Sequence, residues 1–270
     1  MLKKRLIFTL LLNKGVFQLS RNFSLQAVGK LDWLLKHYEL ESLAHSVDEL
    51  VLLNVTRGEK HKGVFREEVA KLGELSFMPI AAGGGIHSVQ DALDLMAAGA
   101  DKLVVNSALF NSPDLVRELV TVFGSQCIVG SLDYRRTGRE TNVFTENGSR
   151  STNMTLENAI RAAEALGVGE LYVTSIDRDG TGHGYDIDVL FEISEICAVP
   201  LIASGGVGDF HHFVDGLKLQ NVTGASTANL FNFLGDGLAS ARKAIEQSGK
   251  PLARWDFEHL RQLAPLGART

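Results

Sequence analysis

The chain is poor in cysteine, has no excess of positive charge and contains no long apolar run. Its 270 residues include two cysteines, Cys127 and Cys197, and neither belongs to a CxxC pair. This excludes a disulfide framework and a cysteine-rich zinc site, and it indicates a reducing, cytoplasmic compartment. The formal charge of −5 argues against a nucleic-acid partner. Because no run approaches the roughly 18 apolar residues of a membrane span, no membrane partner is expected.

The N-terminal run "LIFTLLL" (residues 6–12) could be read as part of a secretory signal, because two lysines and an arginine precede it. The run is short for the apolar region of a signal, however. Asn13 and Lys14 follow it, and no A-x-A-like cleavage site is in view. The sequence therefore favours a buried strand at this position.

Short apolar runs alternate with amphipathic segments along the whole chain, which is 45% hydrophobic and 22% charged. The runs lack clean polar alternation, as expected of parallel strands buried on both faces. Strands are expected at residues 5–11, 49–55, 79–82, 102–106, 127–133, 170–176, 200–204 and 222–227. Helices are expected near residues 30–45, 64–75, 88–98, 112–123, 155–166, 187–197, 209–219 and 236–247. Eight strands, each followed by a helix, predict a (β/α)8 TIM barrel, with an open doubly wound sheet as the alternative.

An internal repeat favours the barrel over the open sheet. "ELVLLNVTRG" (49–58) matches "ELYVTSIDRDG" (170–180), and "PIAAGGGI" (79–86) matches "PLIASGGV" (200–207), both at an offset of 121. Such a repeat is typical of a barrel made from two half-barrels, here about 1–124 and 125–250 of a single domain, 1–250. Residues 251–270 lie beyond it and include "RWDFEHLRQL", which predicts a short helical tail.

Two long polar connections, residues 13–28 and 134–153, stand at equivalent places in the two halves. Both follow the carboxyl end of a strand, where barrel enzymes have their sites. They could be ordinary solvated loops, but their position and symmetry favour loops that cover a substrate.

Two glycine turns, "AGGGI" (82–86) and "SGGVG" (204–208), each connect a strand to a helix. Glycine lets the backbone approach an anion, and the helix that follows offers N–H donors. A tight turn alone would also need glycine. Because the repeat relates the two turns, we predict two phosphate sites at one barrel mouth. Asn106–Ser107 and Ala228–Asn229, from the next strand in each half, would complete them.

Carboxylates at strand ends are the candidates for proton transfer. Asp133 ends the strand at 127–133, and a buried carboxylate there needs a hydrogen bond or a site to face. It is the leading general acid–base candidate. Asp177 and Asp179 precede Gly180 and could act at the mouth or form an Asx turn. In the repeat, Leu11 occupies the place of Asp133, so the first half has no such carboxylate.

Histidines and strand starts are less informative. No histidine has metal-ligand spacing, so no metal site and no cofactor are predicted. Four strands begin with a charged residue: Arg5, Glu49, Lys102 and Glu170. These could close a ring of salt bridges, but spacing alone favours ordinary solvent-exposed strand starts.

Together, "GGGIH", "TSIDRDGT", "ASGG", "FGSQ" and "MLKKR" resemble the cyclase subunit of imidazole glycerol phosphate synthase, a lyase, over about residues 1–247. The resemblance implies a (β/α)8 barrel with a glutaminase subunit on its N-terminal face. Ammonia from that subunit would pass through the barrel and attack a bisphosphorylated substrate. The implied roles are Asp133 for catalysis; Gly85, Asn106 and Ser107 for one phosphate; Gly180, Gly206 and Asn229 for the other; Asn54 and Asp179 at the mouth; Arg5, Glu49, Lys102 and Glu170 as an ammonia gate; and Asp101 at the glutaminase interface.

The chain departs from this family pattern at the mouth. Leu11 stands where a second catalytic aspartate is usual, Leu19 replaces a lysine, Asn54 an aspartate and Asn229 a serine. Losing one of two acid–base groups lowers a rate by about 10²–10⁴.

The opening "LKKRLIFTLLL" with "LSRNF" is similar to a branch of the family that accompanies bacterial surface-polysaccharide genes. That branch implies delivery of ammonia, with a separate amidotransferase, for acetamidino sugars of the O-antigen type. An active histidine-pathway cyclase and a non-catalytic scaffold that activates the glutaminase remain the alternatives.

Overall fold

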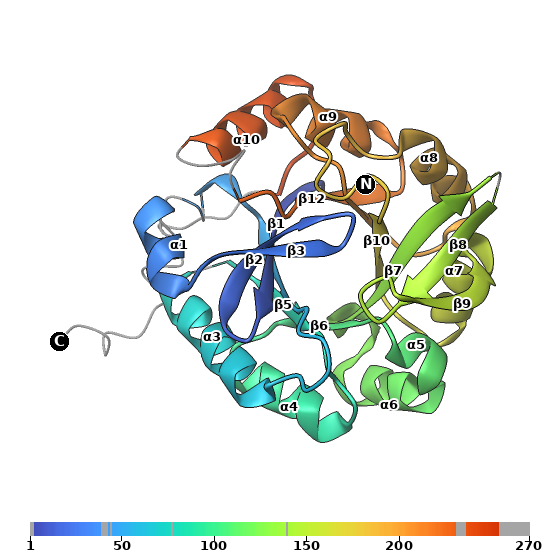
Figure 1. The fold of residues 1–270 in the computed structure, drawn as a ribbon. Helices are drawn as coiled ribbons and strands as arrows, with labels where there is room; N and C mark the ends of the chain where they lie inside the picture. Colours follow the sequence, from blue (N-terminus) through green and yellow to red (C-terminus); the bar gives the residue numbers. More distant parts are fainter. Residues whose placement is uncertain are drawn as a thin grey trace.

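Eight parallel strands close into a barrel in the computed structural model, which describes residues 3–38, 43, 45–76, 78–138, 140–230 and 236–253. The barrel strands are β1 (Arg5–Asn13), β4 (Glu49–Asn54), β5 (Ile80–Gly83), β6 (Lys102–Val105), β7 (Ile128–Thr137), β10 (Glu170–Ser175), β11 (Leu201–Ser204) and β12 (Val222–Thr227). Each pairs with the next, and β12 pairs with β1, so no edge is left open (Figure 1). The predicted TIM barrel is confirmed, and the open sheet is excluded.

Helices surround the barrel (Figure 1). They are α1 (Leu31–His37), α3 (Lys62–Leu75), α4 (Val89–Ala97), α5 (Ala108–Asn111), α6 (Pro113–Phe123), α7 (Leu156–Ala165), α8 (Ile187–Ile196), α9 (Phe210–Lys218) and α10 (Gly237–Gln247), with a 3-10 turn at Ser125–Cys127. The expected start of α4 is confirmed, because the Ser88 side chain caps it by accepting the Asp91 N–H. The helix expected at 30–45 is not continuous, since α1 ends at His37 and the described residues 43, 45 and 46 are helical again. The tail helix predicted beyond residue 253 lies outside the described residues.

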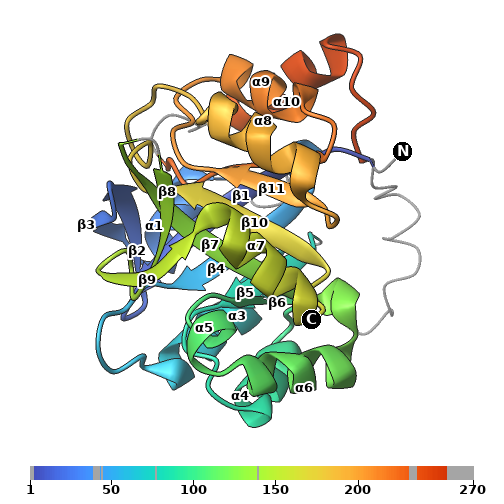
Figure 2. The same cartoon turned by 90° about the vertical axis from the view of Figure 1, so that its right-hand side faces the viewer.

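The two polar connections fold into antiparallel hairpins rather than irregular loops. β2 (Val16–Arg21) and β3 (Ser24–Gly29) follow β1, whereas β8 (Glu140–Thr145) and β9 (Arg150–Thr155) follow β7. The first hairpin turns at Asn22 and Phe23, both in the left-handed region with φ of 50° and 63°. Such a two-residue turn matches the natural twist of a hairpin. Figure 2 shows both hairpins at the end of the barrel opposite the N-terminus of the chain.

Strand alternation separates the core into an outer and an inner part. Along β1, Leu6 and Phe8 belong to the large cluster between barrel and helices, and Ile7 lies with Val51 and Val129 in a smaller inner cluster. This is the period of two expected for strands whose faces meet helices on one side and the barrel axis on the other. No helix within the described ranges is long and apolar enough to cross a membrane.

Candidate functional site

The carboxyl ends of the barrel strands surround a cavity of about 210 Å³. It brings together seven residues predicted from the sequence: Asn54, Gly85, Asn106, Ser107, Asp133, Asp179 and Ala228. Leu11, the apolar residue in place of a second aspartate, also lines it. We call this space the first cavity; it contains the glycine turn of the first half-barrel and the leading acid–base candidate.

A second cavity, of about 280 Å³, lies beside it and contains the glycine turn of the other half-barrel. Gly206 and Asn229, which the repeat predicted for the second anion site, line it, as does Gly180, which the family resemblance implied. The two cavities share four lining residues: Ser20, Asp179, Ser204 and Ala228. One elongated ligand could therefore occupy both.

Both glycine turns adopt conformations that a side chain would not tolerate. Gly85 has a φ of +97° and Gly206 a φ of +106°. A Cβ on Gly206 would lie 2.1 Å from the Gly184 carbonyl oxygen, and one on Gly85 would lie 2.9 Å from Cγ of Lys60. These turns leave backbone open to a ligand, although a tight strand–helix connection would by itself also require glycine.

Asp133 has the electrostatics of a general acid–base group. Burial, and to a lesser extent the negative charge of Asp179, raise its pKa to about 7, against a hydrogen bond from Asn106 that lowers it. The Asn106 Nδ2 donor lies 3.2 Å from Oδ2 of Asp133. A carboxyl group that titrates near neutral pH is suited to both gain and loss of a proton.

Asp177 and Asp179 anchor the two hairpins. Asp179 Oδ2 accepts hydrogen bonds from the Ser20 hydroxyl at 2.5 Å and from the Phe23 N–H at 3.0 Å. Asp177 Oδ2 accepts the N–H of Arg136 at 2.9 Å, where the second hairpin leaves β7. Burial raises the pKa of Asp179, and the Ser20 hydrogen bond opposes that rise. The structure thus favours an anchoring role over proton transfer for this pair.

The hairpins meet above the first cavity. Phe23, at the tip of the first, lies so close to Gly148 of the second that a Cβ there would be 2.8 Å from its ring. Asn147 donates to the Val55 carbonyl oxygen at 3.0 Å. Since Phe23 and Asn147 also line the cavity, the connections cover it, as expected for substrate-covering segments.

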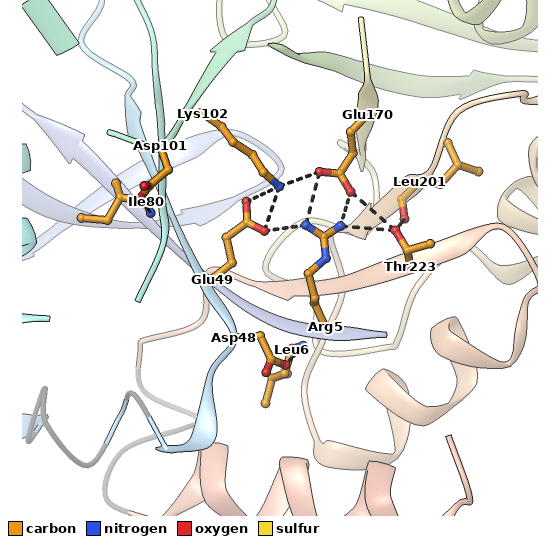
Figure 3. A network of polar contacts seen from close by, with 10 residues as sticks. All are labelled: Arg5, Leu6, Asp48, Glu49, Ile80, Asp101, Lys102, Glu170, Leu201 and Thr223. Atoms are coloured by element: carbon orange, nitrogen blue, oxygen red, sulfur yellow. Dashed lines mark hydrogen bonds and ion pairs between the residues drawn. The ribbon is translucent and has the colours of Figure 1, made fainter. Parts of the chain in front are cut away.

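At the opposite end, the four charged strand starts form a closed ring (Figure 3). Arg5 contacts Glu49, at 2.5 Å, and Glu170, and Lys102 Nζ lies 3.1 Å from each of these carboxylates. Spacing alone favours solvent-exposed charges at these strand starts. That prediction is wrong, because Glu49 and Glu170 are only 2% and 7% exposed. Despite burial, the neighbouring Arg5 and Lys102 lower the pKa of Glu170. The ring forms because the register of the strands brings these four side chains together inside the barrel.

Asp101 lies near this ring, just before β6, and its carboxylate is hydrogen-bonded to the neighbouring strand β5. Its Oδ2 accepts the Ile80 N–H at 2.8 Å, in the way that Asp48 Oδ2 accepts the Leu6 N–H at 2.8 Å (Figure 3). Asp48 also pairs with Arg242 at 2.9 Å. Any contact of Asp101 with a partner would therefore use a carboxylate whose orientation is already set by the Ile80 hydrogen bond.

Comparisons with known proteins agree with this geometry. The family model described as "Histidine biosynthesis protein" matches residues 26–235. A protein of Parasynechococcus marenigrum with the provisional name imidazole glycerol phosphate synthase subunit hisF2 is 37% identical over 256 residues, which cover 94% of this chain and 95% of that protein. The imidazole glycerol phosphate synthase subunit HisF of Hyphomonas neptunium is 36% identical over 253 residues (93% and 99%), and that of Streptococcus mutans 34% over 252 residues (92% and 98%). The chain belongs to the HisF family.

Leu11 separates this HisF-type chain from the pattern expected at the mouth. It is 9% exposed, and its strand neighbours are Gln18 of β2 and Leu53 of β4. An apolar side chain there cannot exchange a proton. The position of Leu11 therefore offers no second acid–base group to work with Asp133 in the first cavity.

A layer of hydroxyl groups, which sequence reasoning missed, separates the two ends of this HisF-family barrel. The buried Tyr172 hydroxyl lies 2.8 Å from Thr9 Oγ1, 2.9 Å from Ser204 Oγ and 3.0 Å from Ser226 Oγ. Thr9, Tyr172 and Ser204 line the first cavity from below. The alternation of β10 could have indicated Tyr172, because it stands two residues after Glu170 and so faces the same way.

Lys60 is a second residue that the sequence did not single out. It lines the first cavity, next to Gly85, but in the sequence it lies within the charged stretch "RGEKHK". Nothing in that stretch distinguishes Lys60 from its solvated neighbours. Among the described residues, no cluster of three or more histidine, cysteine or acidic side chains could hold a metal ion.

Proposed function

We propose that this chain is the synthase subunit of a glutamine-dependent complex, in which a glutaminase partner docks on the N-terminal face and supplies ammonia. The ammonia would pass along the barrel axis to a phosphorylated acceptor at the mouth. The observation that carries the proposal is that a closed ring of four charges and a twin cavity with two glycine turns stand at opposite ends of one barrel.

The barrel interior supports a path for a small neutral molecule. Beyond the ring lie apolar side chains such as Ile7, Val51 and Val129, followed by the hydroxyl layer around Tyr172. Ammonia crosses an apolar layer at far lower cost than ammonium does, since burying a charge is expensive. The hydroxyl oxygens could then accept hydrogen bonds from the N–H groups of ammonia before it reaches the first cavity.

The fate of the ammonia rests on Leu11. The relatives are named as subunits of imidazole glycerol phosphate synthase, and this favours the cyclisation of histidine biosynthesis. Leu11 favours the second candidate, amidination of a surface-polysaccharide sugar by a separate amidotransferase, because cyclisation with Asp133 alone would be about 10²–10⁴ slower.

The test is an assay of the purified protein with the histidine-pathway bisphosphate substrate and an ammonium salt. If the chain serves amidination, wild type is nearly inactive and Leu11→Asp gains turnover, whereas Leu11→Asn, the matched polar control, does not. Turnover by wild type at the level of an authentic cyclase would refute the amidination role and leave ammonia transfer standing.

The glutaminase link is tested separately by mixing the protein with its glutaminase partner and measuring glutamine hydrolysis. Stimulation that is abolished by Glu49→Ala at the ring, with the complex still formed, supports ammonia transfer through this face. If complex formation and stimulation are both absent in wild type, the proposed partnership is wrong.

A further inference from the structure

Lys60 lies in the loop after β4, with its side chain against the first glycine turn. Its Cγ would be 2.9 Å from a Cβ on Gly85, so the stem of the lysine rests on the bare glycine backbone. Its Nζ donates to the Thr56 carbonyl oxygen at 2.7 Å, with the Asn54 carbonyl oxygen at 3.5 Å. An ammonium group has three donors. At least one N–H of Lys60 is therefore available to a ligand in the first cavity.

The charge of Lys60 is not balanced by any carboxylate in the part of the chain that the structure describes. Lys62, two residues on, pairs with Asp91 at 2.7 Å, and Lys102 pairs with Glu49 and Glu170. Lys60 has backbone carbonyls instead, and burial lowers its pKa. A partly buried cation without a counter-ion is costly, and an anion in the cavity would remove that cost.

Asn54 fixes the loop that carries Lys60, and because its amide is uncharged it does not offset the positive charge of the lysine. Its Nδ2 donates to the Lys60 carbonyl oxygen at 2.6 Å, and its Oδ1 accepts the Thr56 N–H at 3.2 Å. The amide is therefore engaged in shaping the loop, which makes Asn54 a positioning residue. A carboxylate at the same place could not donate to the Lys60 carbonyl oxygen and would add a negative charge to this loop.

We propose that Lys60 is the cationic ligand of a phosphate monoester seated on the Gly85 turn, beside Asn106 and Ser107. A phosphate offers three strong acceptor oxygens. Lys60 Nζ, the backbone of the glycine turn and the Ser107 hydroxyl supply donors from three sides of the cavity. The inference rests on the proposed function in one respect, that the acceptor at the mouth is phosphorylated.

The test uses the full-length protein, with inorganic phosphate and fructose 1,6-bisphosphate as probes, and follows the backbone amide resonances of Gly85 and Gly206 by NMR. Each glycine reports its own cavity. We expect Lys60→Met, which keeps the apolar stem, to weaken binding at Gly85 by about 10–100-fold, while the response at Gly206 is retained. Lys62→Met is the matched control and leaves both responses unchanged.

A second variant separates charge from packing. Asn54→Asp is expected to weaken the Gly85 response as Lys60→Met does, and raising the salt concentration should weaken wild type but scarcely affect Lys60→Met. Equal binding at Gly85 by wild type and Lys60→Met overturns the proposal and leaves ammonia transfer untouched. If neither probe shifts Gly85 in wild type, both Lys60 as a phosphate ligand and a phosphorylated acceptor are refuted.

Discussion

Asp133→Asn should make the protein more stable above neutral pH. In the folded protein the carboxyl group has a pKa of about 7, against an ordinary value of 3.8, because it is desolvated and close to Asp179. Because the pKa of Asp133 is raised in the folded state, its contribution to the free energy of unfolding is fully present below pH 3.8 and is lost as the pH rises through 7. Above pH 7 the folded wild type holds a partly buried charge that asparagine does not have.

The size of the effect follows from the shift. Three pKa units correspond to about 4 kcal/mol in the free energy of unfolding. Near pH 4 the variant and wild type should be equally stable, since both side chains are then neutral. Between pH 4 and pH 8 the difference should grow to a few kcal/mol in favour of Asp133→Asn, and asparagine retains an oxygen that accepts the Asn106 hydrogen bond.

The measurement is urea unfolding of both proteins at intervals from pH 4 to pH 8, with ¹³C NMR titration of the Asp133 carboxyl as a direct check. Asp215→Asn is the control, because Asp215 pairs with Lys218 on the surface at 2.7 Å. It should change the unfolding free energy by less than about 0.5 kcal/mol at every pH. A variant that is less stable than wild type at pH 8, or an Asp133 carboxyl that titrates near pH 4, would refute the reasoning.

Three further predictions concern the ring, the hydroxyl layer and the hairpin anchor. Glu170→Ala should lower the free energy of unfolding by about 3–5 kcal/mol, since it leaves Arg5 and Lys102 partly unpaired. The folded protein lowers the pKa of Glu170 from its ordinary value of 4.5, so the stability advantage of wild type should fade as the pH falls below 4.5. Urea unfolding of both proteins at pH 3 and pH 7 would show this. Tyr172→Phe should cost about 1–3 kcal/mol in urea unfolding, since it takes a partner from each of three buried hydroxyls, and an unchanged stability would contradict that network. Gly180→Ala would bring a Cβ to 2.1 Å from the Ser20 carbonyl oxygen, and should raise the protease sensitivity of the first hairpin; Gly249→Ala, also left-handed but in open space, should not.

The barrel was predictable because its signal is repeated along the chain. Continuous apolar strands such as 49–55 and 170–176 imply parallel pairing, and the repeat implies that four strand–helix units occur twice. The hairpins were not predicted, although "NKG" (13–15), which turns β1 into β2, and "ENG" (146–148), which connects β8 to β9, are turn signals that could have indicated them. The polar composition of these two segments is typical of solvated loops as well as of exposed hairpins.

The site was predictable only where it depends on sequence order. Glycine turns and strand ends lie at the mouth of any such barrel, so Gly85 and Asp133 could be placed there. Whether Arg5 meets Glu170 depends instead on register around the closed sheet, and spacing within one strand does not contain that information. Lys60 depends on the path of a loop that Asn54 fixes by side-chain hydrogen bonds, and a lysine in a charged stretch gives no sign of it.

The anchoring of both hairpins by one short segment has a thermodynamic consequence. Asp177 and Asp179 lie two residues apart, yet one holds the second hairpin at Arg136 and the other holds the first at Ser20 and Phe23. Undocking of either hairpin therefore frees the segment on which the other depends, so the two equilibria are linked and the linkage is reciprocal. A ligand that orders one hairpin should slow amide hydrogen exchange in the other, although the strands of the two hairpins are not paired with each other.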